Sequence, residues 1–179
     1  MRWDELFDDL EAQARHEERL DRDAEVADRR ERELAQVALV HRLAATGGAV
    51  VGVQLDDGSW VEGVVADVGV GWVLLTSGDG RRQVLVAAVA VAAVRGLGHH
   101  VGPPPGTVAA RRTLVLALRT LAREREPVLV RTRAGDVRGV LGRIGADHLD
   151  VEPEVRGRGA AQDGVTVPFA ALLSVTGTL

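Results

Sequence analysis

The sequence has no cysteine, no lysine and no tyrosine, and its only aromatic residues are three tryptophans and two phenylalanines. The lack of cysteine excludes disulfides and thiolate metal sites, so the chain suits a reducing compartment and we expect a cytoplasmic protein. With so few rings, there is little surface on which nucleic-acid bases could stack.

Long hydrophobic runs are also missing. The longest uncharged apolar run, Val84 to Val94, has eleven residues, whereas a membrane-spanning helix needs about 20. The N-terminus opens with acidic residues rather than with the basic and then apolar residues of a secretion signal. We therefore expect a soluble protein with no membrane span.

Catalytic and metal-binding patterns are absent from the sequence as well. His16, His41 and His148 stand alone, with no nucleophile motif, phosphate-binding loop or paired-acid spacing around them. His99 and His100 are neighbours, but adjacent side chains of an extended segment point in opposite directions, and no carboxylate lies close in sequence. We expect no enzymatic activity, no cofactor and no metal site.

Charge is distributed unevenly along the chain, whose formal net charge is −4. Residues 1–46 carry eight arginines against thirteen acids, while the remainder carries fourteen against thirteen. All 22 basic residues are arginine, and together with the abundance of alanine, glycine and valine this indicates a GC-rich bacterial coding bias rather than a composition selected for nucleic acid. The acidity therefore belongs to the N-terminal part.

Residues 3–45 are predicted to be helical, because they contain no proline and the first glycine is Gly47. Apolar residues at spacings of three and four form one helical face near the N-terminus: Trp3, Leu6, Phe7 and Leu10. The segment that follows has too much interleaved arginine and acid to bury much surface. We interpret residues 1–29 as a charged helical arm whose apolar face either packs on the rest of the protein or binds a protein partner.

After Gly47 the hydrophobic period changes from 3.6 to 2, which predicts strands. Turn signals at Asp57-Gly58 and at residues 77–80 separate the alternating runs. The predicted strands are Val51–Leu55, Trp60–Val68, Trp72–Thr76 and a long run from Gln83 to Val94 that bends in the middle. Five short strands in about 50 residues are typical of a small barrel.

The most informative feature of the sequence is an internal repeat. At an offset of 76, Gly63 and Gly69 correspond to Gly139 and Gly145. At an offset of 81, residues 84–86 correspond to residues 165–167. Turn and apolar positions that recur in the same order would otherwise require independent coincidences. The expected organisation is the arm at 1–29, a helix and first barrel at 30–97, a Pro/Gly linker at 98–106, and a second helix and barrel at 107–179.

These residues resemble the Sm-like fold, and most closely its bacterial host-factor-Q branch. The segments that carry the resemblance are Leu55–Gly58, Val61–Gly63, Trp72–Leu75 and, as the family's closing strand, 3₁₀ turn and strand, Val165–Val175. The resemblance covers residues 47–97 and 127–179. It implies two tandem five-stranded Sm-like barrels of the SH3 type, each preceded by a helix. Residues 1–11 also resemble the start of an actinobacterial protein family.

The family's RNA-binding positions are largely replaced in this chain. Glycines 69 and 145 stand where Sm-like rings place an aspartate at a strand bend, and Val73 and Leu149 stand at the polar or aromatic position of the third strand. Arg95, followed by Gly96, matches the family's Arg-Gly element. A separate basic group lies on the polar faces of two predicted strands and consists of Arg131, Arg133, Arg138 and Arg143. Binding of RNA or DNA through Arg95 and this group is the alternative function.

The run Val84–Val94 has no polar face, and strands that are apolar on both faces are buried on both. In Sm-like proteins this region pairs with the neighbouring barrel, so we expect it to form the contact between the two copies or between subunits. The candidate contact residues are Val84, Val86, Val89 and Val91. Because open strand edges invite pairing, the leading hypothesis is a non-enzymatic assembly or adaptor protein that engages a protein partner or a second copy of itself. A capped monomer stays open as an alternative to the homo-oligomer.

Overall fold

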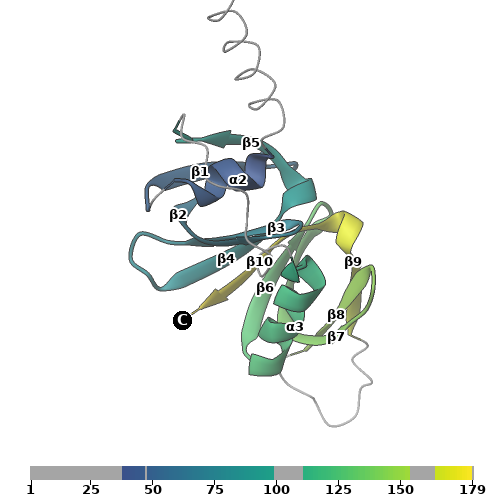
Figure 1. The fold of residues 1–179 in the computed structure, drawn as a ribbon. Coiled ribbons are helices and arrows are strands. Elements are labelled where there is room, and N and C mark those ends of the chain that lie inside the picture. Colours follow the sequence, from purple (N-terminus) through teal and green to yellow (C-terminus); the bar gives the residue numbers. More distant parts are fainter. Residues whose placement is uncertain (1–37, 47, 99–110, 154–163, 179) are drawn as a thin grey trace, which may run out of the picture. The chain divides into compact units, whose positions relative to one another are not determined.

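The computed structural model describes residues 38–46, 48–98, 111–153 and 164–178. Within these ranges the chain forms two α-helices and ten strands, and all ten strands join in one antiparallel sheet (Figure 1). The sheet is open, with β5 and β9 at its two ends. The predicted mainly β class is confirmed.

The elements follow one another in two similar series. The first is α2 (Leu39–Ala44), β1 (Val50–Leu55), β2 (Trp60–Gly69), β3 (Trp72–Thr76), β4 (Arg82–Ala87), the 3₁₀ turn η1 (Ala88–Ala90) and β5 (Val91–Arg95). The second is α3 (Leu114–Glu124), β6 (Pro127–Thr132), β7 (Gly135–Ile144), β8 (His148–Glu152), β9 (Val165–Pro168), η3 (Phe169–Ala171) and β10 (Leu172–Thr178). The predicted bend in the run from Gln83 to Val94 is confirmed and coincides with η1.

The two halves of the sheet repeat one strand order. Neighbouring strands run β5-β1-β2-β3-β4 in the first half and β10-β6-β7-β8-β9 in the second. Irregularities recur at equivalent places, since the pairing of β2 with β3 shifts between Val65 and Asp67 and that of β7 with β8 shifts between Leu141 and Ile144. The repeat in the sequence is therefore a repeat of strand order and of local defects in the ladder.

Two of the repeated glycines make room for a ring from the following strand. A Cβ atom on Gly69 would lie 2.3 Å from Nε1 of Trp72, and a Cβ atom on Gly145 would lie 2.5 Å from Cε1 of His148. Both distances are too short for any side chain. Trp72 and His148 are themselves equivalent at the offset of 76, so the repeat conserves a glycine beneath a ring in both halves.

Strands β4 and β10 join the two halves. Their register pairs Val84–Val86 with Ser174–Thr176 in antiparallel order. Alternate residues of a strand point to opposite faces, yet every residue from Val84 to Ala87 is buried. The joint therefore explains why this run has no polar side: one face of β4 packs within the first half and the other packs toward α3 and the second half.

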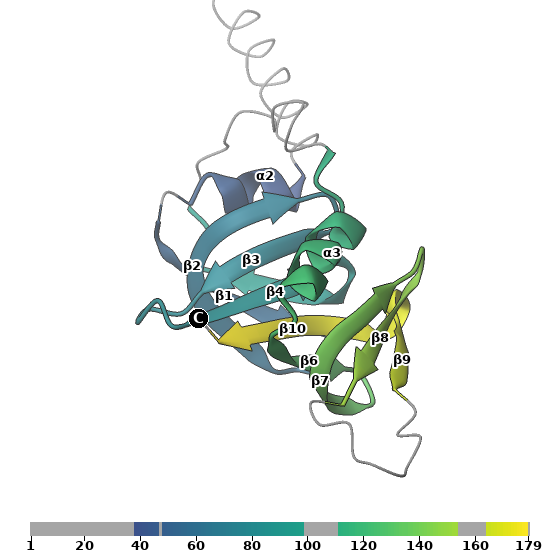
Figure 2. The same cartoon turned by 90° about the horizontal axis from the view of Figure 1, so that it is seen from below.

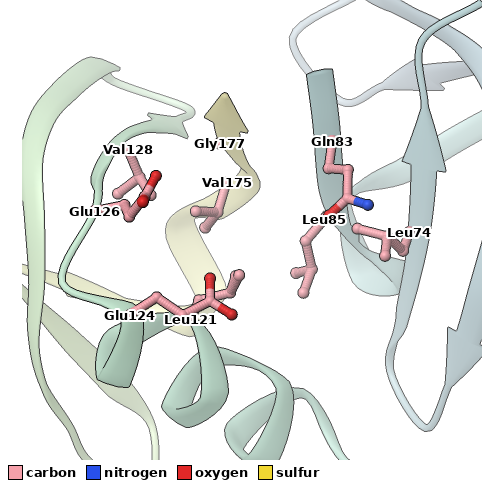
Figure 3. Close-up of a pocket in the computed structure, with 9 residues that line it drawn as sticks. All are labelled: Leu74, Gln83, Leu85, Leu121, Glu124, Glu126, Val128, Val175 and Gly177. Atoms are coloured by element: carbon pink, nitrogen blue, oxygen red, sulfur yellow. The ribbon is translucent and has the colours of Figure 1, made fainter. Parts of the chain in front are cut away.

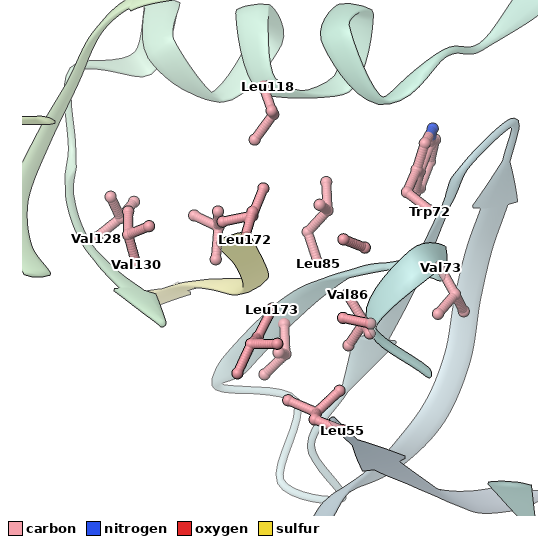
Figure 4. Packing of buried hydrophobic residues seen from close by; sticks show 14 of the residues in the cluster. Leu55, Trp72, Val73, Leu85, Val86, Leu118, Val128, Val130, Leu172 and Leu173 are labelled. Carbon is pink, nitrogen blue, oxygen red and sulfur yellow. The ribbon is translucent and has the colours of Figure 1, made fainter. Parts of the chain in front are cut away.

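Strand β10 is likewise buried on both faces. Figure 4 shows the side chain of Leu172 pointing toward Leu118 and Val130, and that of Leu173 pointing toward Leu55 of the first half. Both leucines are fully buried. The buried residues of the two halves consequently form one continuous hydrophobic cluster, and the described residues from Leu39 onward belong to one compact unit.

Helix α3 covers the sheet near this joint. The hydroxyl of Thr113 caps its N-terminus by accepting a hydrogen bond of 3.3 Å from the backbone N–H of Leu116. The helix ends where Arg125 adopts a left-handed φ of 56°. It packs against β7, and Figure 2 shows it lying over β4. The predicted helix at 107–126 is thus confirmed for residues 114–124, while its residues 107–110 lie outside the described ranges, as do residues 99–106 of the predicted linker.

Helix α2 is short and packs against β2, with Leu43 as its buried residue. It falls inside the predicted helix at 30–46, while residues 1–37 lie outside the described ranges. None of the helices in the described part of the chain has the length and apolar composition of a membrane-spanning helix.

Candidate functional site

The predicted site residues fall into three groups once they are placed on the fold. Trp3, Leu6, Phe7 and Leu10 lie outside the described residues. The valines of the apolar run lie at or near the joint between the halves. The arginines of the alternative function are spread over four places, and the structure brings only two of them together.

Among the predicted contact valines, Val84 and Val86 lie in β4, opposite Thr176 and Ser174 of β10. Val89 and Val91 take no part in this strand pairing, because the chain turns at η1. Val89 is 69% exposed, and Val91 begins β5, where it pairs with Leu55. An uninterrupted apolar run thus serves two different strands and leaves one valine at the surface.

Arg95 is held by its neighbours on the outer surface of the first half. Its guanidinium lies 4.5 Å from the centroid of the Trp60 ring, a cation–π contact, and forms an ion pair with Glu62. A Cβ atom on Gly52 would lie 2.6 Å from Nε of Arg95, so this glycine allows the side chain to cross the strand. The predicted Arg-Gly element is therefore already paired with a carboxylate of the same half.

Arg133 and Arg131 connect the two halves near the β1–β2 hairpin. Nη2 of Arg133 lies 2.6 Å from Oδ2 of Asp56, and its Nη1 donates to the backbone carbonyl of Ala170. Nη1 of Arg131 donates to the hydroxyl of Ser59 at 3.1 Å. These contacts reinforce the joint, and they take Arg133 out of any shared basic surface.

A second place gathers arginines from both halves. Arg82, Arg131, Arg138 and Thr176 line one open cavity of about 350 Å³. The prediction from sequence included Arg131 and Arg138 but missed Arg82. Arg143, also on β7, is exposed and does not line this cavity. The pair Arg81-Arg82 immediately before an apolar strand was the available signal for the missing member.

Two carboxylates outside this cavity interact electrostatically with its arginines, and the pKa of each is lowered. The hydroxyl and backbone N–H of Ser59 lower the pKa of Asp57, with a smaller contribution from the charge of Arg131. The hydroxyl of Ser77 and the backbone N–H of Arg81 lower the pKa of Asp79, again with a minor contribution from Arg82. Since hydrogen bonds to a carboxylate favour its charged form, both residues moderate the positive potential of the arginines.

A largely apolar groove lies between α3 and the strands beneath it. Trp72, Leu85, Leu116 and Leu121 contribute to a cavity of about 260 Å³. Figure 3 shows the adjoining smaller cavity, with Leu121 of α3 facing Leu85 of β4. Arg112, in the segment before α3, also lines the larger cavity.

Arg112 fastens that segment to the first half. Its backbone carbonyl accepts hydrogen bonds from Nε1 of Trp72 at 2.9 Å and from the backbone N–H of Val70 at 2.8 Å. Its guanidinium forms an ion pair with Asp67. The entry to the second half is thereby tied to the β2–β3 hairpin of the first.

No profile of a known protein family matches this chain, and no curated protein matches its sequence. Any function must therefore be argued from the geometry. In the part of the chain that the structure describes, no group of three or more His, Asp or Glu side chains is arranged to hold a metal ion.

The two ends of the sheet complete the candidate surfaces. β5 pairs with β1 alone and β9 pairs with β8 alone among the described strands. Val165 at the start of β9 is 47% exposed, and it borders an open cavity of about 330 Å³ beside the β6–β7 hairpin. In β5, Ala92 and Ala93 are exposed and small enough to let another backbone approach.

Proposed function

We propose that this protein is a non-enzymatic assembly or adaptor protein built on two tandem Sm-like barrels. It joins a second copy of itself, or a protein partner, through the open ends of its sheet and through its N-terminal helical arm.

This proposal rests on which strands stand at the two ends of the sheet, each with one edge that pairs with no other described strand. The joint inside the chain pairs the fourth strand of the first half with the fifth strand of the second half. The strands left at the ends are the fifth of the first half, β5, and the fourth of the second half, β9. A second molecule can therefore add by repeating, between chains, the pairing that already exists within one.

Charge does little to block this addition. Unpaired backbone N–H and C=O groups on an edge strand are a template for another strand unless charge, proline or a bulge protects them. No charged residue occurs in β9, which Pro168 ends, and the only charged residue in β5 is Arg95, at its end. The pairing of β5 with β1 is irregular at Ala92 and regular from Ala93 to Arg95, so the open template consists of these three residues and Val165–Val167. Head-to-tail contacts of this kind form a ring when the rotation closes and a filament when it does not.

The arm supplies the second contact of the proposal. Trp3, Leu6, Phe7 and Leu10 recur at helical spacing within a strongly acidic segment. An amphipathic helix of this kind binds by laying its apolar face into a groove. The arm and the sheet edges are separate elements, so their contributions can be tested separately.

The test is the mass in solution, measured by sedimentation equilibrium over a range of protein concentrations. Val165→Asp places a charge on the β9 edge, and Val70→Asp places the same charge at an exposed position between β2 and β3, outside both edge strands, as the matched control. We expect the wild type and Val70→Asp to self-associate, and Val165→Asp to shift toward the monomer with an unchanged melting temperature. Equal masses for the two variants would remove β9 from the contact.

Deletion of residues 1–20 tests the arm in the same experiment. We expect the deletion to change the mass or to abolish capture of a partner by the full-length protein. If neither changes, the arm does not take part in assembly.

A further inference from the structure

The arginine-lined cavity is built from four neighbouring strands that belong to both halves. Residues paired across an antiparallel ladder lie on the same face of the sheet. Thr176 of β10 pairs with Leu129 of β6, and Leu129 pairs with Arg138 of β7. Arg131 is two residues from Leu129 and therefore shares its face.

Arg82 reaches the same face from the first half. It pairs with Thr178 of β10, two residues beyond Thr176. The register of β4 on β10 thus brings Arg82 to the cavity that Arg131, Arg138 and Thr176 also line. Neither half alone contains this arrangement.

The members of the cluster differ in how far they are neutralised. Arg131 is oriented by Ser59 and by Asp136, whose Oδ1 lies 3.5 Å from its Nε. Arg82 and Arg138 have no ion pair within the described ranges. Among the other arginines of these ranges, four are each paired with a carboxylate, namely Arg95, Arg112, Arg125 and Arg133, and the rest form no ion pair there. Arg82 and Arg138 differ from those other arginines in lining the same cavity.

We propose that this cavity binds the phosphate group of a small phosphorylated molecule, a phosphate monoester. Two unpaired guanidinium groups with free N–H forks, one oriented guanidinium and one hydroxyl match the acceptor oxygens of a phosphate dianion. The inference is independent of self-assembly through the sheet edges, because β5 and β9 contribute nothing to the cavity.

The surroundings favour a compact anion over a nucleic-acid strand. No aromatic side chain lines the cavity, so bases have nothing on which to stack. A bound strand also needs a track of cations along its backbone. Here the charged carboxylates of Asp57 and Asp79 lie near Arg131 and Arg82, and Arg133 is paired with Asp56.

Binding is measured by equilibrium dialysis of the full-length protein at pH 7.5 with inorganic phosphate, glycerol 3-phosphate and an oligouridylate as separate probes. The variants are Arg82→Gln, Arg138→Gln and Arg138→Lys. Arg143→Gln is the matched control, because it removes the same charge from β7 outside the cavity. All three positions are exposed, and melting temperatures verify that the four variants fold.

We expect saturable binding of phosphate and glycerol 3-phosphate, weakened about tenfold or more by Arg82→Gln and by Arg138→Gln and unchanged by Arg143→Gln. Arg138→Lys should give an intermediate affinity, because lysine keeps the charge but loses the fork. No phosphate binding, or equal loss in Arg143→Gln, would overturn the proposal. Binding of the oligouridylate alone, with a steep loss of affinity in salt, would overturn it in favour of the nucleic-acid alternative.

Discussion

Trp72 and His148 occupy equivalent places in the two halves of the sheet, and their surroundings differ. Trp72 is 5% exposed, and its Nε1 donates to the carbonyl of Arg112 in the segment that enters the second half. The side chain of His148 is 40% exposed, and its ring contacts the adjacent Asp147. In the first half, Arg112, which is 40 residues away in sequence, covers the Trp72 ring and accepts its hydrogen bond. In the second half, the equivalent ring of His148 is partly exposed to solvent.

The two halves also differ in net charge. Residues 47–106 carry three arginines against five acids, while residues 107–179 carry eleven against eight. The strand order, the ladder shifts and the glycine beneath a ring are common to both halves. The duplicated part is therefore the backbone scaffold, and the surface side chains on it have diverged. The arginine cavity arises only where the two surfaces meet.

The largest effect is expected from a charge placed inside the joint that makes the two halves one unit. Val86→Asp buries a carboxylate without a partner on a strand that is covered on both faces, which costs on the order of 3–5 kcal/mol of unfolding free energy. Val89→Asp carries the same change at an exposed position and should cost less than about 0.5 kcal/mol. Urea unfolding monitored by circular dichroism measures both.

A single unfolding transition at a lower midpoint is the expected result for Val86→Asp. Two separate transitions would show that the halves can unfold independently, and similar midpoints for the two variants would contradict the assignment of β4 to the joint.

A smaller but clear difference is expected between the equivalent ring positions. Trp72→Ala removes a buried ring and its hydrogen bond to Arg112, with an expected loss of about 3 kcal/mol. His148→Ala removes a half-exposed ring and should cost about 1 kcal/mol or less. Unfolding midpoints of the two variants provide the comparison. Equal losses of unfolding free energy in the two variants would mean that the contact of Trp72 with Arg112 does not stabilise the first half.

The parts of the fold that depend on local pattern could be predicted from the sequence. Alternation placed the strands, and the recurring glycines revealed the repeat because each one has a steric role in the backbone. Val89 shows the limit of that approach: an unbroken apolar run predicted burial, but the 3₁₀ turn changes the direction of alternate side chains and leaves Val89 exposed.

The parts that depend on long-range register could not be predicted. Arg82 lies at the same cavity as Arg131 and Arg138 only because β4 pairs with β10. The register between strands some 90 residues apart cannot be predicted from a local sequence pattern. The contact of Trp72 with the carbonyl of Arg112 is equally non-local. Sequence comparison within the chain therefore revealed the scaffold, while the candidate site needed the assembled sheet.

The finest comparison concerns a second pair of equivalent glycines, Gly63 and Gly139. A Cβ atom on Gly139 would lie 2.2 Å from the carbonyl oxygen of Glu152, and one on Gly63 would lie 2.6 Å from that of Thr76. Because the backbone must move in both cases, the free energy of unfolding of each alanine variant should fall by about 1–3 kcal/mol, with the larger loss at Gly139.

Gly177→Ala is the control, since nothing lies within 4 Å of its Cβ position. Urea midpoints that rank the variants as Gly139, Gly63 and Gly177, from most to least destabilised, would support a shared steric role in both halves. An undiminished midpoint for Gly139→Ala would mean that the β7–β8 ladder can yield where the β2–β3 ladder cannot.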